Sequence, residues 1–441
     1  MRALRSVMNI WGVRHLQLSA LSCPVGIMLR ALFFAVLLAS PSVTLAAESA
    51  LSLQELIDEA LRNSPEIRAS EMRAEAAGYR VPQVQSLPDP MVSVGYQNEG
   101  FRRYTYGESS DAQWMYSITQ AFPFPGKLSL KGEVSAKDAE AASEAYRNTK
   151  AKVVQKVKEQ YYDLAFAHKN LELVRERSSL FDMVEQAAVA RYAAGKGSQQ
   201  DVLMAQTEKY MLIEREAMLK QKIQALQAML NSTIGRDASA PLARPVVSEP
   251  TLYALNQSDI TTMVLSTSPD VQARQRLIGS AEAKLKFAKK DILPDFSVTG
   301  SYFTRKGEFQ DMWSLTVGMS IPIFAATKQK KAVHEAEAML REAQSELEAT
   351  KLMLASNVQD YFSMLRTTET LMDLYRNSLI PKARQDIESV TAAYTAGRSD
   401  ALTVIIRLKS LIEFETLYWN QFAEREKTIA RLMALSGSTG K

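Results

Sequence analysis

The sequence predicts a mainly α-helical protein with a membrane β-barrel part, and three observations support this fold class. Two segments, at about 91–122 and 295–322, alternate apolar with small polar residues in the period of two that is typical of β-hairpins. Most of the remaining chain places apolar residues three or four positions apart, which indicates long helices. The same order of landmarks occurs twice, which indicates a tandem duplication.

The apolar side of both predicted hairpins is expected to face lipid. In the second hairpin, Phe296, Val298 and Tyr302 alternate with serine and threonine, and the first hairpin shows the same pattern. Strands of about 9–11 residues with an apolar outer face and aromatic ends are typical of membrane barrels. The aromatic residues expected on this face are Tyr96, Trp114, Tyr116, Tyr302 and Trp313.

Four strands are too few to close a barrel by themselves. Open strand edges are not tolerated in hydrocarbon, and the smallest closed barrels have about eight strands. If these hairpins span a membrane, several copies of the chain must therefore share one barrel. The alternative is a soluble protein in which two hairpins cap a helical bundle.

The first 46 residues are predicted to be a signal peptide. Arg30 precedes the apolar run 31–39, small residues follow around Ala46, and Met28 is an alternative start. This segment contains four basic residues, no acidic residue and the only cysteine, Cys23. Without it, the 49 acidic residues of the chain are matched by as many basic ones, so the composition gives no support to a nucleic-acid partner.

Two structural repeats are predicted, at 47–240 and 258–435, joined by a linker at 241–257 and followed by a disordered tail at 436–441. Each repeat should begin with helices. Ser64 and Ser268 are expected N-caps, each followed by proline at the first helical position. These two serines are 204 positions apart, and the hairpin-closing residues Pro123 and Pro322 are 199 apart.

A long helical pair should follow each hairpin, at about 127–231 and about 327–435. Each pair turns at a glycine, Gly195 in the first repeat and Gly397 in the second. We expect Pro381 to kink or interrupt its helix, because proline removes one hydrogen bond and clashes with the preceding turn.

Motifs of covalent chemistry are absent from the sequence. After the signal peptide only His168 and His334 remain as histidines, and no zinc-protease, serine-hydrolase or P-loop motif occurs. We therefore predict no catalytic, cofactor-binding or metal-binding residue, and no enzyme activity.

The order of these features resembles the TolC-like family of outer-membrane efflux proteins over essentially the whole chain from Leu51 to Leu435. The quoted motifs are Leu87-Pro88-Asp89-Pro90, Pro123-Phe124-Pro125-Gly126-Lys127, Arg191-Tyr192-Ala193-Ala194-Gly195 with Asp201-Val202-Leu203, and Ile234-Gly235-Arg236. The second motif is also similar to the heavy-metal-efflux, CzcC-like branch. The resemblance implies a homotrimer with a shared 12-stranded barrel in the outer membrane and a helical tunnel across the periplasm.

The resemblance also places the glycine turns at the periplasmic tip, where family members narrow the pore. The candidate tip and gate residues are Tyr192, Gly195, Asp201, Tyr394, Gly397, Arg398, Asp400 and Thr403. Thr403 stands where some family members carry an aspartate, while Asp400 would form a ring of three charges in a trimer. For Arg398 and Asp400, simple capping of a helical turn is an equally weighted alternative.

The expected function is that of a passive conduit in a tripartite efflux system. Its expected partners are a periplasmic adaptor protein, an inner-membrane transporter and outer-membrane lipid. Two alternatives stay open at this point. One is a periplasmic adaptor protein with long helical hairpins, and the other is the outer-membrane conduit of a type I protein secretion system.

Overall fold

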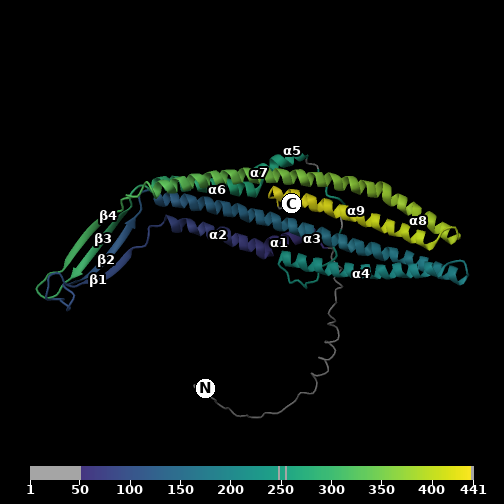
Figure 1. Ribbon diagram of the computed structural model, residues 1–441, viewed down its shortest axis with the longest axis horizontal. Coiled ribbons are helices and arrows are strands. Elements are labelled where there is room, and N and C mark those ends of the chain that lie inside the picture. Colours follow the sequence, from purple (N-terminus) through teal and green to yellow (C-terminus); the bar gives the residue numbers. More distant parts are fainter. Residues whose placement is uncertain (1–50, 247–248, 254–255, 439–441) are drawn as a thin grey trace, which may run out of the picture. The chain divides into compact units, whose positions relative to one another are not determined.

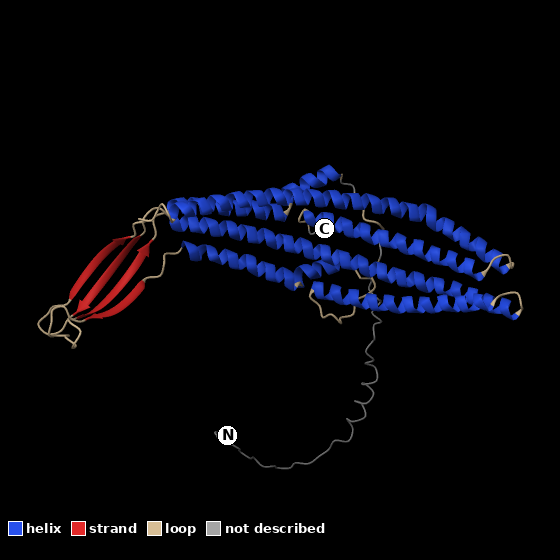
Figure 2. Ribbon diagram, viewed as in Figure 1, coloured by secondary structure: helices blue, strands red, loops and turns tan. Residues whose placement is uncertain are grey.

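The computed structural model describes residues 51–246, 249–253 and 256–438, in which helices carry a four-stranded sheet at one end (Figures 1 and 2). The predicted signal peptide, 1–46, and the alternative start Met28 lie outside these residues. The first half contains α1 (Leu53–Asn63), α2 (Pro65–Gln85), β1 (Met91–Gln97), β2 (Gln113–Phe122), α3 (Lys127–Ala193) and α4 (Gln199–Ile234). The second contains α5 (Gln257–Thr267), α6 (Pro269–Lys290), β3 (Phe296–Thr304), β4 (Met312–Met319), α7 (Gln329–Leu374), a π-helical turn (Tyr375–Leu379), α8 (Ile380–Thr395) and α9 (Ala401–Leu435).

The second half repeats the element order of the first, with one difference. The 67-residue helix α3 is continuous, whereas its counterpart divides into α7, a π-helical turn and α8. Pro381 is the second residue of α8, which begins directly after the π-helical turn. Because proline cannot donate a backbone hydrogen bond, the helix reorganises there, and the predicted interruption is confirmed.

The short helices begin as their prolines predict, with one correction. Ser64 and Ser268 are the N-cap residues of α2 and α6, and Pro65 and Pro269 follow them. Neither serine side chain makes the expected capping hydrogen bond. Both serines are instead buried between consecutive helices, so proline rather than the hydroxyl defines these starts.

The sheet has the order β1-β2-β3-β4, and all neighbouring strands are antiparallel. Directly opposed residues share a face of the sheet, so the register shows which side chains lie together. Across all four strands one such row is Val94, Tyr116, Tyr302 and Trp313, and a neighbouring row on the other face is Ser93, Ser117, Ser301 and Ser314. The predicted separation into an apolar and a small polar face is confirmed for these rows. At one end of the sheet it breaks down, because the row Gly95, Met115, Phe303 and Met312 lies on the same face as the serines.

The buried apolar residues lie along the helices and form three clusters. The first joins α1 and α2 to α3 and α4, and it contains Val154, Val157, Tyr161 and Leu164 of α3, which are three or four positions apart. The second joins the ends of α3, α4, α8 and α9 next to the two glycine turns. The third joins α5, α6, α7 and α9.

The C-terminal end shows a difference from the sequence prediction. Ser436, expected to begin a disordered tail, is buried, and its carbonyl oxygen accepts a hydrogen bond of 3.2 Å from the Thr267 hydroxyl. The first residue of the tail therefore packs against Thr267, the last residue of α5. Residues 439–441 lie outside the described part.

Candidate functional site

The α3–α4 turn is held by its own backbone and by a capping box. Gly195 has a positive φ of 70°, a conformation that glycine adopts without strain. The N–H of Lys196 donates to the carbonyl of Arg191 at 2.8 Å. At the start of α4, the Ser198 hydroxyl accepts from the N–H of Asp201 at 3.1 Å, and the Asp201 carboxylate accepts from the N–H of Ser198 at 3.4 Å. Asp201 is therefore a capping residue in this turn.

The α8–α9 turn repeats this geometry with a different cap. Gly397 has a φ of 74°, and the N–H of Arg398 donates to the carbonyl of Ala393 at 2.8 Å. Asp400 is the N-cap of α9, and its carboxylate accepts from the N–H of Thr403 at 2.8 Å. Hydrogen bonding to Thr403 lowers the pKa of Asp400, so its charge is favoured. Capping, one of the two roles weighed for Asp400, is thus present, whereas the side chain of Arg398 is exposed.

Arg191 connects the two turns, and sequence reasoning did not single it out as a site residue. Its guanidinium donates to the carbonyl of Tyr394 at 2.8 Å and lies 4.9 Å from the centre of the Tyr394 ring. It also reaches the carbonyl oxygens of Ser399 and Lys196, each at 3.5 Å. One side chain of α3 therefore binds backbone groups on both sides of the boundary between the helical pairs.

The two turn tyrosines have different environments, although they occupy equivalent places in the repeats. Tyr394 is 3% exposed, and burial raises its pKa. Tyr192 is 50% exposed. The difference has a sequence counterpart: Arg191 precedes Tyr192, whereas Ala393 precedes Tyr394. That asymmetry was visible in the sequence and could have identified Arg191.

The structure thus brings together only some of the predicted tip residues. Tyr394 contacts Arg191, and Asp400 contacts Thr403, but Asp201 contacts neither Arg398 nor Asp400 through a hydrogen bond or ion pair within the described residues. The assignment of these residues to a gate stays a prediction.

The predicted lipid-facing aromatics lie on one face of the sheet. Trp114, Tyr116, Tyr302 and Trp313 are exposed, with Trp313 the most exposed at 78%. Tyr96 is half-buried instead, because it stacks on Tyr104 with ring centres 4.9 Å apart. Aromatic rings at strand ends suit the boundary between hydrocarbon and water.

The connection between sheet and helices is held by an ion cluster around Lys127. This lysine begins α3, and its ammonium group lies 2.9 Å from Asp295 and 3.1 Å from Asp291, at the end of α6. It also donates to the carbonyl of Leu293 at 2.8 Å, and the Asp295 carboxylate accepts from the N–H of Phe124 at 2.7 Å. The two proline-containing motifs around 123–127 and 293–295, which lie far apart in the sequence, therefore meet here.

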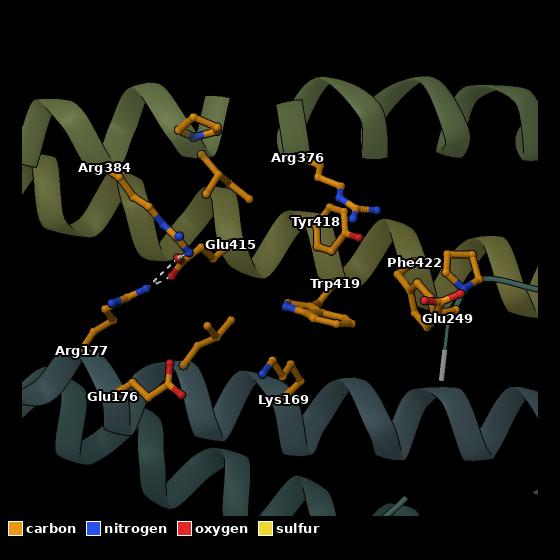
Figure 3. Close-up of a pocket in the computed structure, with 14 residues that line it drawn as sticks. Lys169, Glu176, Arg177, Glu249, Arg376, Arg384, Glu415, Tyr418, Trp419 and Phe422 are labelled. Atoms are coloured by element: carbon orange, nitrogen blue, oxygen red, sulfur yellow. Dashed lines mark hydrogen bonds and ion pairs between the residues drawn. The ribbon is translucent and has the colours of Figure 1, made fainter. Parts of the chain in front are cut away.

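A cavity of about 720 Å³ lies between α3, the π-helical turn and α9 (Figure 3). At one end, the buried Glu415 pairs with Arg177 at 2.7 Å and Arg384 at 2.9 Å. In the middle of the cavity, Trp419 lies below Tyr418, and Lys169 lies 5.3 Å from the Trp419 ring, while Phe422 and Glu249 lie at the other end (Figure 3). Side chains of both charge signs line this cavity.

In the described ranges, no helix combines the length and apolar composition needed to cross a bilayer. Within those ranges we also find no cluster of three or more histidine, cysteine, aspartate or glutamate residues able to hold a metal ion. The geometry offers an apolar sheet face, an ion-paired sheet–helix connection and a pair of bonded helical turns.

Comparison with known proteins identifies the family of this chain. The sequence profile described as outer membrane efflux protein matches residues 56–236 and 261–405. The chain is 23% identical to the outer membrane protein OprJ of Pseudomonas aeruginosa, over 87% of this chain and 84% of OprJ. It is 22% identical to the cobalt-zinc-cadmium resistance protein CzcC of Cupriavidus metallidurans, over 66% of this chain and 69% of CzcC. The crystal structure of the outer membrane protein VceC of Vibrio cholerae superposes with a TM-score of 0.74 at 17% identity, over 88% of this chain and 97% of VceC.

A sheet with an apolar outer face on a long helical body defines the class of outer-membrane channels with a periplasmic extension. The chain belongs to the outer membrane efflux protein family. It is the outer-membrane channel component of a tripartite efflux system, located in the outer membrane and extending into the periplasm. The adaptor and type I secretion alternatives are not favoured by this family match.

Proposed function

We propose that three copies of this chain form a passive conduit that carries substrate from an inner-membrane transporter and its periplasmic adaptor protein across the outer membrane. The carrying observation is the four-stranded sheet, whose outer strands β1 and β4 each have one unpaired edge while its apolar face is exposed. Such edges are costly in hydrocarbon, and a sheet shared among copies removes them. Three sheets of four strands would make one barrel of 12.

The chain's own residues would supply three functions to this conduit. The apolar sheet face contacts lipid, and the small polar face lines the lumen. The two glycine turns form the periplasmic tip, and their movement opens the path. No covalent step, cofactor or nucleic-acid partner enters this proposal.

The oligomer and the conduit can be tested together. Protein extracted in mild detergent is expected to have the mass of three chains and to give discrete conductance steps in planar lipid bilayers. Multi-angle light scattering measures the first, and single-channel recording the second. A monomer that stays in solution without detergent would contradict the shared barrel.

The charged residues of the second turn are expected to restrict ion flow at the tip. Replacing both Arg398 and Asp400 by alanine should raise single-channel conductance, because threefold symmetry would concentrate these exposed charges around the axis. Single-channel recording at several salt concentrations measures the effect.

Loss of the Asp400 cap must be separated from loss of its charge. Removing an N-cap costs about 1 kcal/mol, whereas Asp400→Asn keeps a capping oxygen and removes the charge. We expect Arg398→Ala with Asp400→Asn to reproduce the conductance change. Unaltered conductance in both double variants would remove these residues from the gate.

A further inference from the structure

The outer strands β1 and β4 carry enough information to define how neighbouring copies pair. We propose that β4 of one copy lies antiparallel to β1 of the next, with Met319 opposite Val92, Val317 opposite Val94 and Leu315 opposite Tyr96. This inference rests on the proposed trimer. It goes further by giving the register, which sets the outline of the whole barrel.

The register follows from equivalent positions in the two hairpins. Asp89 and Asp295 close the same Leu-Pro-Asp motif and are 206 positions apart, while Pro123 and Pro322 are 199 apart. Adding 206 to a residue of β1 gives its equivalent in β3, and adding 199 to a residue of β2 gives its equivalent in β4. The observed pair Val92–Ile118 of the first hairpin then corresponds to Val298–Val317, which is an observed pair of the second hairpin. The hairpins are therefore superimposable copies with one pairing scheme.

The contact between the hairpins then predicts the contact between copies of the chain. Strand β2 pairs with β3 through Gln120–Val298, Ile118–Gly300 and Tyr116–Tyr302. When β2 is replaced by its equivalent β4, and β3 by its equivalent β1, the same offsets convert these pairs into Met319–Val92, Val317–Val94 and Leu315–Tyr96. The central seam of the sheet is thus the template for the seam between copies.

The chemistry of the two faces agrees with this register and excludes a slip of one residue. In the observed sheet, Leu315 shares a face with Val92, and Trp313 shares a face with Val94. The proposed pairs keep apolar residues on that face and place Ser93 opposite Gly318 on the polar one. A slip of one residue would turn one strand's apolar side chains toward the lumen.

The sheet–helix connection supports the same arrangement. Lys127 pairs with Asp295 inside one copy, whereas Asp89, the equivalent of Asp295, is exposed. The 199-residue offset makes Ala326 the equivalent of Lys127, and Lys328 is the lysine two positions further on. Lys328 is exposed too, and neither it nor Asp89 has an ion-pair partner in the described part of the chain. Pairing of neighbouring copies would bring Asp89 toward the connection that carries Lys328.

Disulfide mapping tests the register directly, because Cys23, the only cysteine, can be replaced by serine. Val94→Cys with Val317→Cys is expected to link three chains on a non-reducing gel after mild oxidation. Val94→Cys with Leu315→Cys or with Met319→Cys should link poorly. Directly opposed Cβ atoms lie about 4.5–5.5 Å apart and diagonal neighbours about 7–8 Å, whereas a disulfide needs Cβ atoms about 3.5–4.5 Å apart.

A matched control is the observed pair inside one copy, Ile118→Cys with Gly300→Cys, which should form a disulfide without joining chains. Stronger linking of a diagonal pair would overturn the register. So would absence of linking by Val94 and Val317 in a trimer whose control pair forms. A monomeric mass in mild detergent would contradict the proposed trimer itself. Failure of the trimer can therefore be distinguished from a wrong register.

The ion pair between copies has its own test. Asp89→Lys should lower the temperature at which the detergent-extracted trimer dissociates, and adding Lys328→Asp should restore it. Equal dissociation temperatures for the wild type and the Asp89→Lys variant would show that this pair does not form.

Discussion

Replacing Arg191 by alanine is expected to favour opening of the proposed periplasmic tip and to raise the open probability of the channel. The substitution removes the 2.8 Å hydrogen bond to the Tyr394 carbonyl and the contact with the Tyr394 ring. A hydrogen bond from a charged donor contributes about 1.5–3 kcal/mol, and a difference of about 1.4 kcal/mol changes an equilibrium constant tenfold. The population of the open tip should therefore increase on the order of tenfold, as measured by open probability in planar bilayers.

Two variants separate the contacts of Arg191 from its charge. Arg191→Lys keeps the charge but loses the planar guanidinium, so we expect an intermediate increase. Tyr394→Phe keeps the ring and the backbone carbonyl that Arg191 binds. The hydroxyl that this substitution removes has no hydrogen-bond partner in the described part of the chain, so the variant channel should behave like the wild type. If Arg191→Ala leaves open probability unchanged, the two turns of one copy move together when the tip opens.

The sequence predicts this fold well where local patterns decide the structure. Alternation in 296–304 and 312–319 defined both strands and the face of each side chain. Glycine at 195 and 397 predicted turns with positive φ, and Pro381 predicted the interruption that the structure shows as a π-helical turn. These features depend on the conformational limits of single residues, which can be inferred from the residue type alone.

Contacts between distant segments were not predicted, because no local pattern specifies them. Arg191 was read only as part of a turn motif, yet its partner Tyr394 is 203 residues away. The capping role of Asp400 was anticipated as one of two alternatives, since capping needs only Thr403, three positions on. The pairing of Lys127 with Asp295 joins two motifs whose shared geometry appears only when β2 and β3 are side by side.

Replacing Lys127 by methionine is expected to weaken the connection between sheet and helices and to lower trimer stability. The lysine side chain is 4% exposed, and its loss leaves Asp291 and Asp295 close together without their cation. Breaking a fully buried ion pair costs about 3–5 kcal/mol, and we expect about 2–3 kcal/mol here because both aspartates are partly exposed. Thermal unfolding followed by circular dichroism measures the loss, and Lys152→Met, an exposed position on the same helix, is the control.

The pH dependence of stability gives a second readout for this cluster. Burial disfavours the Asp295 carboxylate, but the Phe124 N–H and Lys127 outweigh burial and lower the pKa of Asp295. The contribution of Asp295 to folding stability is therefore complete above about pH 4 and is lost as pH falls through the lowered pKa. Burial also disfavours the Lys127 charge, yet hydrogen bonds to Asp295 and Asp291 outweigh burial and raise the pKa of Lys127. The contribution of Lys127 to folding stability is therefore complete below about pH 10 and is lost as pH rises through the raised pKa. Lys127→Met should remove the alkaline loss and reduce the acid loss, because the Phe124 N–H still binds Asp295. An unchanged profile at both ends would show that this cluster does not hold the sheet to the helices.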